Sequence, residues 1–559
     1  MRDLRAASLV QSAFLEKCTE PRDILSAALA DYGRLLETLY ANGHYGGVIQ
    51  IRIDGREAAD LPLLTVPARI REIVITVNPG PVFQFGRTAI SPLAPGTDLL
   101  PEFRIGQPAR SVAIRDAVAG AVGNWRDAGH AKAKPVDQRI VADHVVNTLS
   151  TEIRLDPGPR IQFGDLIVAT PSAVRAAKIK RIAGLPSGKV YSPEALARLV
   201  TRLRRTGAFS SVSLAEAEML GVGNSMDINL TLADEKPRRF GFGAEVSSLE
   251  GLNVSGYWLH RNLFGGAERL RVESKVNNIR GQTNGIDYSL GVRIDFPAVF
   301  GPDTNVFATT SFEHLNEPDF VSDLVALGGG VVWHISDQLV AEAGGTFARS
   351  QTSDGLGARK FSLLTLPAAL TLDRRDFPLD PTNGYFAKIE ATPFLGMAGS
   401  ASGARVYVDG RVYRGLGAQN GTVLAARLQF GSVAGTAITQ VHPDFLFYSG
   451  GYGTVRGQPY KSLAVDLGGG IKIGGRSFLG VSLEARANVT KNIGAVAFFD
   501  AGYIGAESFF NGSGAWHSGA GLGLRYKTGI GPIRLDVAMP VGGNTGSGVQ
   551  IYLGIGQTF

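Results

Sequence analysis

The chain has 559 residues, of which 44 % are hydrophobic, 19 % are charged and 72 are glycine. At about 150 residues per domain this length allows three to four domains, and the apolar content excludes disorder as the main state. The only cysteine, Cys18, excludes a disulfide framework within the chain and a Cys-rich metal site, and we expect neither a metal nor a cofactor. The net charge of +6 is spread without a long Lys/Arg block, so we expect a solvated surface of mixed charge and no nucleic-acid partner.

Two targeting signals are missing from the sequence. It contains no run of about 18 apolar residues, so a transmembrane helix is not expected. The first residues, Met1 to Leu4, lack the apolar region of a signal peptide. Alone, these features would favour the cytoplasm. Because the rest of the sequence does not favour the cytoplasm, we expect that the start is either a processed or a truncated one.

The first 235 residues contain a repeat. The segment PGPVFQFG at 79–86 recurs as PGPRIQFG at 157–164, an offset of 78 residues that suits a small domain. A second landmark repeats with it, because helical patterns end in a glycine at Gly43, Gly129 and Gly207. Glycine at that position supplies the left-handed residue that closes a helix.

Each repeat predicts a small α+β module with a strand, helices and two further strands. Alternating sequence such as 48–53 follows each helix and predicts a strand. The predicted modules cover 1–79, 80–157 and 158–236. In the first module helical periodicity begins at Leu4, so we expect its leading strand to be missing.

From Arg238 onward, alternation with a period of two replaces the helical pattern. Residues 237–559 divide into about 16 segments of about 20 residues, and 16 is an even strand number that membrane barrels adopt. A soluble sandwich would show similar alternation. Charged residues on one face of long strands favour a barrel, with its apolar face toward lipid and its polar face around a wet lumen. The predicted fold is therefore tandem α+β modules followed by an all-β, 16-stranded transmembrane barrel.

These pieces resemble a known family. Tandem modules of about 78 residues with Gly-Pro hinges resemble POTRA domains, and the barrel resembles that of the outer-membrane assembly superfamily that includes BamA and TamA. Three such modules with a 16-stranded barrel are most similar to the branch of TamA, the translocation and assembly module subunit. The resemblance covers nearly the whole chain. Its most specific motifs are GGYGTVRGQPY at 450–460 and FFDAG at 498–502.

The resemblance implies that the first motif lies on a loop between barrel strands 11 and 12, which folds into the lumen, where Arg456 meets acids. Alternation places Asp500 on the lumen face, and Glu484 on the lumen face of the preceding strand. An arginine fork paired to carboxylates explains why these residue types stand there. The alternative is a surface turn. The expected loop anchor consists of Val455, Arg456, Gly457 and Tyr460, where the family's aromatic residue is displaced to Tyr460.

Alternation also places Arg534 and Asp536 on the lumen face of the penultimate strand, where we interpret them as structural. Enzymatic alternatives have little support. The segment GLPSGKV at 184–190 is one residue short of a P-loop and has Val190 where Ser or Thr should bind Mg²⁺. The histidines are scattered, and we expect the chain not to be an enzyme.

Closure of the barrel pairs the first strand, 238–248, with the last, 549–559, and both are rich in glycine. Glycine within strands weakens pairing, so we predict that this seam opens laterally toward lipid. The alternative is that the glycines relieve crowding inside the barrel. We expect Phe240 or Phe242 to lie opposite Leu553 or Ile555. The predicted seam residues are Phe240, Gly241, Phe242, Gly243, Gly554, Gly556 and Phe559.

The function that the resemblance implies is that of an outer-membrane assembly factor. Its barrel would lie in the outer-membrane lipid bilayer, and its modules would lie in the periplasm and receive unfolded outer-membrane or autotransporter-type proteins. A TamB-like partner, anchored in the inner membrane and spanning the periplasm, is implied as well. One alternative is a two-partner secretion transporter, which would be expected to carry two modules. The others are a porin-like passive channel and a soluble β-rich binding protein.

Overall fold

The computed structural model describes residues 2–16, 20–62, 69–247, 251–281, 285–417, 420–529 and 531–555, so that Cys18 lies outside the described residues. The chain forms two compact units. The first consists of 1–167, 185–197 and 215–229, and the second of 168–184, 198–214 and 230–559. The second unit contains the barrel.

The N-terminal segment begins with helices, and a small sheet of order β2-β1-β3 follows. Asp31, which is buried on α3, accepts hydrogen bonds from the Ser8 hydroxyl and the Leu9 N–H, both at 2.6 Å. These bonds hold the start of α2 against α3, because they satisfy N–H groups that a helix start leaves unpaired. The elements are α1 (Arg2–Ala7), α2 (Leu9–Leu15), α3 (Pro21–Ala41), β1 (Val48–Ile53), β2 (Arg56–Glu57) and β3 (Ile73–Asn78).

Two further sheets share one strand order, in which the strand that comes last in sequence lies in the middle: β4-β6-β5 and β7-β9-β8. The three predicted helix-ending glycines, Gly43, Gly129 and Gly207, all have positive φ, so that prediction is confirmed. No helix among the described residues is long and apolar enough to cross a lipid bilayer. The elements are β4 (Gln84–Ser91), α4 (Ser111–Asp127), β5 (Lys134–Asp143), β6 (Thr148–Asp156), β7 (Gln162–Val168), α5 (Ala176–Ala183), α6 (Pro193–Arg205), β8 (Phe209–Glu216) and β9 (Ser225–Asp234).

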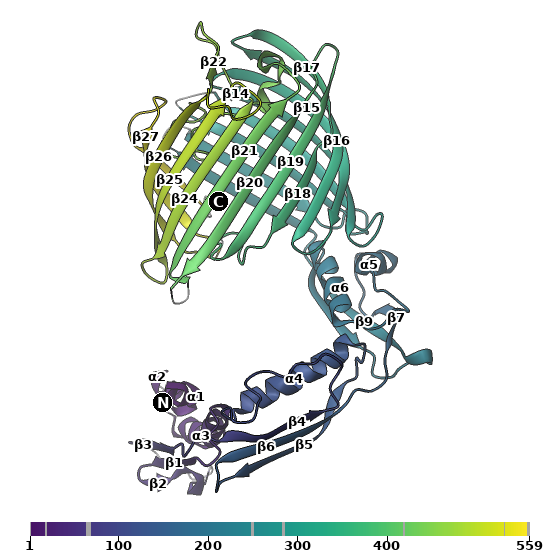
Figure 1. Cartoon of the computed structure of the whole chain (residues 1–559), viewed down its shortest axis with the longest axis vertical. Coiled ribbons are helices and arrows are strands. Elements are labelled where there is room, and N and C mark those ends of the chain that lie inside the picture. The colour runs from purple at the N-terminus through teal and green to yellow at the C-terminus, as the bar shows by residue number, and fades with distance from the viewer. Residues whose placement is uncertain are drawn as a thin grey trace. The chain divides into compact units, whose positions relative to one another are not determined.

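From Arg238 the chain forms a closed barrel of antiparallel neighbours, shown in Figure 1. Closure leaves no open edge in the sheet, which is the condition for strands to cross lipid. A sandwich is thereby excluded. The strands are β10 (Arg238–Ser247), β11 (Gly251–His260), β12 (Arg269–Ile279), β13 (Asp287–Phe296), β14 (Thr304–Glu317), β15 (Phe320–His334), β16 (Leu339–Asp354), β17 (Gly357–Thr365), β18 (Ala368–Asp373), β19 (Gly384–Met397), β20 (Gly403–Leu416), β21 (Thr422–Ala434), β24 (Ser477–Asn488), β25 (Ile493–Gly505), β26 (Ala515–Tyr526), β27 (Ile533–Gly542) and β28 (Gln550–Ile555).

The segments β17 and β18 form a single strand of the barrel. Both pair with β16 and with β19, and the register is the same on either side of Leu366 and Pro367. Proline has no N–H to donate to the ladder, which accounts for the interruption. Counted in this way, the described residues form 16 barrel strands, and the predicted number is confirmed.

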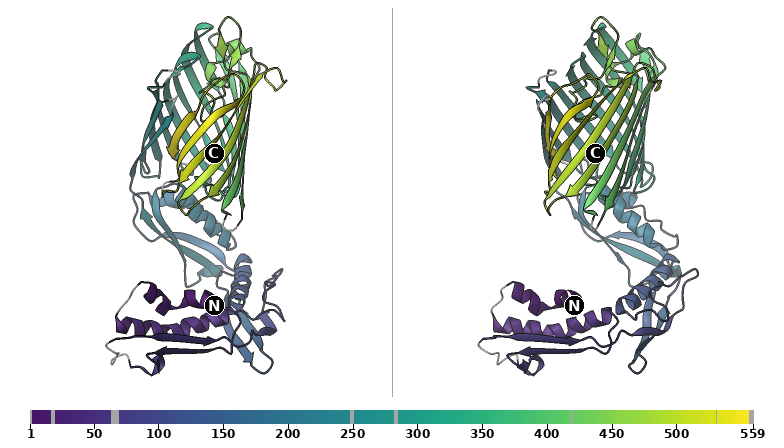
Figure 2. Two further views of the ribbon diagram at one scale, coloured as in Figure 1. Left: turned by 90° about the vertical axis from the view of Figure 1, so that its left-hand side faces the viewer. Right: turned by 60° about the vertical axis from the view of Figure 1, so that its left-hand side comes forward.

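The two faces of the strands differ as the alternation predicts. On β27, Ile533, Leu535 and Val537 are exposed toward the outside of the barrel, whereas Arg534 and Asp536 between them are buried in the lumen. Figure 2 turns these C-terminal strands, in yellow, toward the viewer. The outer apolar face suits contact with lipid, and the inner polar face suits contact with a filled or wet lumen.

Candidate functional site

The segment between β21 and β24, residues 435–476, forms a loop that reaches into the barrel, and we call it the luminal loop. It joins barrel strands 11 and 12, as the resemblance implies. Its tip is tightened by hydrogen bonds from the Gly450 N–H to the Thr454 hydroxyl and from the Gly451 N–H to the Gln458 carbonyl. Val455, Arg456 and Gln458 are fully buried there, so the tip lies inside the lumen and not on the surface.

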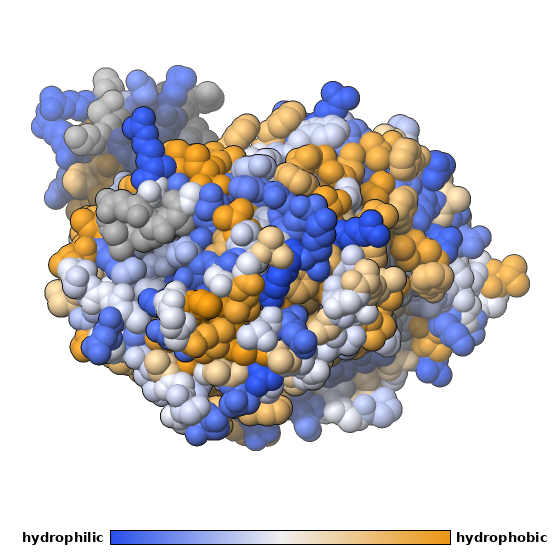
Figure 3. Space-filling model, turned by 90° about the horizontal axis from the view of Figure 1, so that it is seen from above, coloured by the Kyte–Doolittle hydropathy of each residue, from blue (hydrophilic) through white to orange (hydrophobic). Residues whose placement is uncertain are grey.

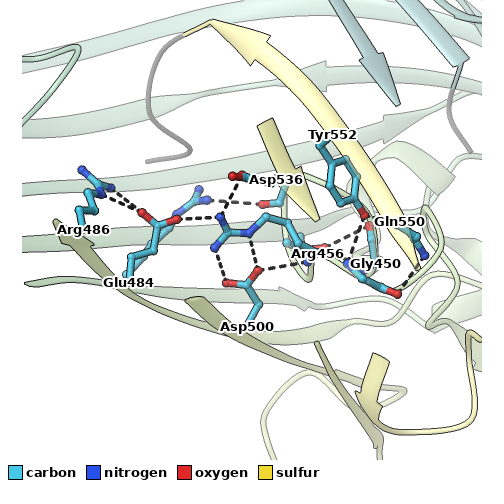
Figure 4. A network of polar contacts seen from close by, with 12 residues as sticks. Gly450, Arg456, Glu484, Arg486, Asp500, Asp536, Gln550 and Tyr552 are labelled. Carbon is cyan, nitrogen blue, oxygen red and sulfur yellow. Dashed lines mark hydrogen bonds and ion pairs between the residues drawn. The ribbon is translucent and has the colours of Figure 1, made fainter. Parts of the chain in front are cut away.

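Arg456 is held by the carboxylates of Asp500, Glu484 and Asp536, as Figure 4 shows. Its Nε and Nη2 bind the two oxygens of Asp500 on β25, at 2.7 and 3.0 Å, and its backbone N–H donates to the same carboxylate at 3.1 Å. Its Nη1 lies 2.7 Å from Glu484 Oε1 on β24 and 3.5 Å from Asp536 Oδ2 on β27. The Phe498 ring covers the guanidinium, with its centroid 3.6 Å from Cζ. The loop tip is thus fixed by a bidentate, charge-assisted contact.

Two more arginines complete this set of charges. Arg486 donates to Glu484 at 2.8 Å, and Arg525 donates to Asp536. With Arg456 and Asp500, three guanidinium groups face three carboxylates, and each side chain is at least nine-tenths buried. A buried charge is tolerated only when it is paired and hydrogen-bonded, which this arrangement achieves.

The luminal loop also binds the last strand directly. The Gly457 N–H donates to the Tyr552 hydroxyl at 3.2 Å, and the Gln550 side chain donates to the Gly457 carbonyl at 2.9 Å. Gly457 has φ of +90°, and a Cβ there would lie 2.6 Å from the Met539 carbonyl oxygen. Only glycine fits this position. The Arg456 anchor and the Gly457 contact therefore connect the loop tip to the strands that precede the barrel's closure.

Gln458 stands where the family pattern expects an aromatic residue. It is fully buried, and its side-chain amide donates to the carbonyls of Ser518 and Gly542 on β26 and β27. Tyr460 lies elsewhere and donates its hydroxyl to Glu317 at 3.2 Å. Tyr460, the displaced aromatic residue, is therefore separated from Arg456 in the structure. The hydrogen-bonded Gln458 fills the space beside Arg456.

The seam is the pairing of β10 with β28. Among the described residues, Val246 lies opposite Leu553 and Ser247 opposite Tyr552. Continuing this register leaves Phe240 and Phe242 opposite none of residues 550–555, so the predicted facing of these phenylalanines with Leu553 or Ile555 is wrong. Both phenylalanines point toward the outside of the barrel, at 65 % and 86 % exposure. Gly556 and Phe559 lie outside the described residues.

The described seam glycines lie close against neighbouring side chains. A Cβ on Gly241 would lie 2.2 Å from the Tyr257 ring, one on Gly243 would lie 2.8 Å from the Ser255 hydroxyl, and one on Gly554 would lie 2.7 Å from Arg534 Nη2. This geometry favours the alternative interpretation, in which glycine relieves crowding inside the barrel.

An ion pair crosses the seam above Gly554. Arg534 on β27 reaches over β28 and donates to Glu245 on β10 at 2.9 Å. The Tyr452 ring of the luminal loop lies against the Arg534 guanidinium, 3.8 Å from Cζ, and 6.0 Å from the Tyr552 ring. The luminal loop, the last two strands and the first strand thus meet at one place.

Within the second unit, basic side chains of α5 and α6 bind one turn of the barrel. Arg202 donates two hydrogen bonds to Asp303, in the turn between β13 and β14, and Arg205 donates a third. The hydrogen bond from Arg202 is the largest cause of the lowered pKa of Asp303. Lys178 donates to the Pro297 carbonyl in the same turn. These contacts join the two helices to the barrel by charged hydrogen bonds.

Some residues of the site could not be assigned to it from the sequence. Alternation shows that Asp536 faces inward, but not that it lies near Arg456. Gln550 and Tyr552 alternate correctly with outward residues, yet nothing local indicates that they bind Gly457. Gln458 is visible only as a departure from the family pattern, which is a signal of changed packing.

Comparison with known proteins places this geometry in a family. The model of the Omp85 superfamily domain matches residues 219–559. Three solved structures each cover 85 % of this chain at 13–16 % identity, which shows a shared fold. They are BamA from Haemophilus ducreyi lacking POTRA domains 1–3 (16 % identity, 100 % of that chain, TM-score 0.63), CdiB from Acinetobacter baumannii (13 %, 90 %, 0.55) and CdiB from Escherichia coli (14 %, 91 %, 0.51). The chain belongs to the Omp85 superfamily of outer-membrane β-barrel proteins.

Proposed function

We propose that this protein is an assembly and translocation factor of the TamA type, which helps to insert outer-membrane or autotransporter-type β-barrel proteins. Its N-terminal modules lie in the periplasm and receive unfolded substrate, and a TamB-like protein from the inner membrane delivers it. The role requires no enzymatic chemistry, because strand pairing and burial in lipid supply the driving force.

One observation carries this proposal. The luminal loop occupies the lumen and contacts the strands on one side of the seam, through Arg456, Gly457 and Tyr452. A passive channel needs an open lumen, whereas an assembly barrel needs a defined place where its sheet can pair with another strand. The loop contacts support an assembly barrel, because the hydrogen bonds and ion pairs inside the lumen lie beside the strands where the barrel closes.

A two-partner secretion transporter of the same superfamily is the second candidate. The likeness of fold to the two CdiB structures favours it. Such transporters are expected to carry two modules, whereas this chain has three small sheets before the barrel. The number of modules therefore favours the first candidate.

The experiment is insertion of a substrate into lipid vesicles that contain the full chain. Vesicles of phosphatidylethanolamine and phosphatidylglycerol receive an unfolded outer-membrane barrel protein diluted from urea, and heat-modifiable gel migration measures its folding. We expect the chain to accelerate folding, Arg456→Ala to abolish the acceleration, and the matched control Arg414→Gln, an exposed cation outside the site, to leave it unchanged. Export of a soluble passenger without acceleration would favour the second candidate, and steady ion conductance without either would favour a porin-like channel.

A further inference from the structure

The outer surface of the barrel carries a group of polar and charged side chains where a lipid-facing surface is otherwise apolar. It lies on β15, β16 and β17, toward the end of the barrel opposite to the one at which β10 begins. The strand register defines it in rows. Asp323, Gln351 and Lys360 face one another in one row, and Val325, Arg349 and Ser362 form the next. We call Asp323, Arg349, Gln351, Lys360 and Ser362 the outer patch.

The next row toward the middle of the barrel is apolar and consists of Leu327, Phe347 and Leu364. All of these rows point outward, because the residues between them on the same strands, such as Ser322 and Ser350, are buried in the barrel. A hollow of about 670 Å³ runs over both the polar and the apolar rows. A molecule that fits it has a polar or charged head beside an apolar body.

The position along the strands matches the level of lipid headgroups. Trp333, on the same outward face of β15, is 55 % exposed and lies ten residues from Asp323. Exposed tryptophan marks the membrane interface, and about 9–11 tilted residues span the hydrocarbon region. If Trp333 marks one interface, the outer patch lies at the other. Figure 3 looks onto the barrel from that end and shows hydrophilic and hydrophobic residues side by side.

The charges of the outer patch favour an anion. Arg349 and Lys360 are exposed, and neither has a carboxylate partner among the residues that the structure describes. Asp323, the one acid of the patch, is bound to His314 Nδ1 at 2.7 Å. At the level of the headgroups, two cations without a carboxylate partner attract an anionic lipid group. Arginine forms bidentate bonds to phosphate, and lysine binds it as a point charge.

We propose that the outer patch binds the phosphate groups of a membrane lipid, with Arg349 and Lys360 on the phosphates and acyl chains along Leu327, Phe347 and Leu364. With the module orientation proposed above, this end of the barrel faces the outer leaflet, where the lipid is a phosphorylated glycolipid. The headgroup contact is independent of that orientation.

The test is titration of diphosphoryl lipid A into the full chain in detergent micelles, with bound lipid counted by native mass spectrometry. We expect Arg349→Gln/Lys360→Gln to weaken binding about thirtyfold, because each cation near an anionic surface contributes about a factor of five. The charge-preserving Arg349→Lys/Lys360→Arg variant should bind as the native protein does. Heat-modifiable migration verifies that each variant is folded.

Three controls identify the source of the binding. Arg414→Gln removes an exposed cation on β20 and should leave lipid binding unchanged. Lipid A without its phosphates should bind equally to the native and the double variant. Inorganic phosphate alone should not be retained. The proposal would be overturned if the double variant bound lipid A as tightly as the native protein, or if Arg414→Gln lost as much affinity as the double variant. Retention of free phosphate, or a loss of affinity that persists with dephosphorylated lipid, would overturn it as well.

Discussion

The tripeptide pattern Arg-x-Asp occurs on the lumen face of β13, at Arg293 and Asp295, and again on β27, at Arg534 and Asp536. On β13 the two side chains bind each other at 2.9 Å, and Arg293 also binds Glu342 on β16; Arg293 and Asp295 remain 34 % and 24 % exposed. On β27 the same residue types are at most 4 % exposed, and each binds a partner on another strand. The sequence pattern is the same, and the surroundings differ.

The luminal loop accounts for the difference. It covers the lumen face of β24 to β28, where its Arg456 enters the set of charges and its Tyr452 lies against Arg534. On β13, pairs exposed to water gain little, because solvent screens them. On β27, pairs shielded from water become expensive to break, since an unpaired charge would remain buried. Alternation therefore fixes which face a residue occupies, whereas the loop determines what its charge contributes.

The largest expected effect is that of Arg456→Ala. It leaves Asp500 and Glu484 without their guanidinium, at a cost of about 3–5 kcal/mol for a dry site. We expect a lower temperature of heat-modifiable unfolding and loss of assembly activity, with the barrel still folded at 25 °C. An unfolding temperature equal to that of the native protein would show that the lumen around Arg456 is wet.

The second prediction concerns the seam, where the first strand, β10, pairs with the last strand, β28. The substitutions Val246→Cys and Leu553→Cys place two cysteines opposite each other across the seam, where oxidation can join them by a disulfide. Cys18 is replaced to avoid stray thiols. Crowding relief explains the seam glycines without lateral opening, so the crosslink tests opening directly: a seam that opens requires that oxidation stop substrate insertion and that a reductant restore it. Each single cysteine variant should stay active under oxidation. Full activity with the seam crosslinked would exclude lateral opening as the route.

The third prediction tests the pair that crosses the seam. Gly554→Ala puts a Cβ 2.7 Å from Arg534 Nη2 and should displace the guanidinium from Glu245. We expect a loss of about 1 kcal/mol in the free energy of unfolding. Gly291→Ala on β13 is the matched control, because nothing lies within 4 Å of its Cβ, and alanine there should be neutral or slightly stabilising. If the two substitutions changed the free energy of unfolding equally, the Arg534–Glu245 ion pair would not stabilise the seam.

The smallest effect is expected for Arg293→Gln. Its partners, Asp295 and Glu342, are partly exposed, so the change should cost about 0.5 kcal/mol or less, and less still at high salt. The measurement is the unfolding temperature at two salt concentrations. A loss as large as that of Arg456→Ala would show that burial does not separate the two sides of the lumen.

Much of the fold could be predicted from the sequence, because it depends on local pattern and chain length. Alternation gives the strands, their number and their faces, including the inward Glu484 and Asp500. Glycines after helical patterns mark where the helices of the modules end. The break at Pro367 follows from proline's missing N–H, and it does not change the register of the strand.

The remaining parts of the site depend on contacts between distant segments. The path of the luminal loop determines that Gly457 meets Tyr552 and that Asp536 joins Arg456, and no local pattern encodes this path. The register of the seam depends on how all the strands are staggered around the barrel. The local pattern of the two terminal strands does not encode it, and the expected facing of Phe240 or Phe242 with Leu553 or Ile555 is therefore wrong.

The balance of charge in the lumen has a consequence for movement of the loop. Three guanidinium groups and three carboxylates make a neutral set while Arg456 is in place. If the loop tip withdraws, it takes one positive charge away and leaves a cavity with an excess of one negative charge, lined by β24, β25 and β27. A cavity of that sign attracts a replacement cation. Withdrawal is therefore an exchange of counter-ions, in which another cation takes the place of the Arg456 guanidinium.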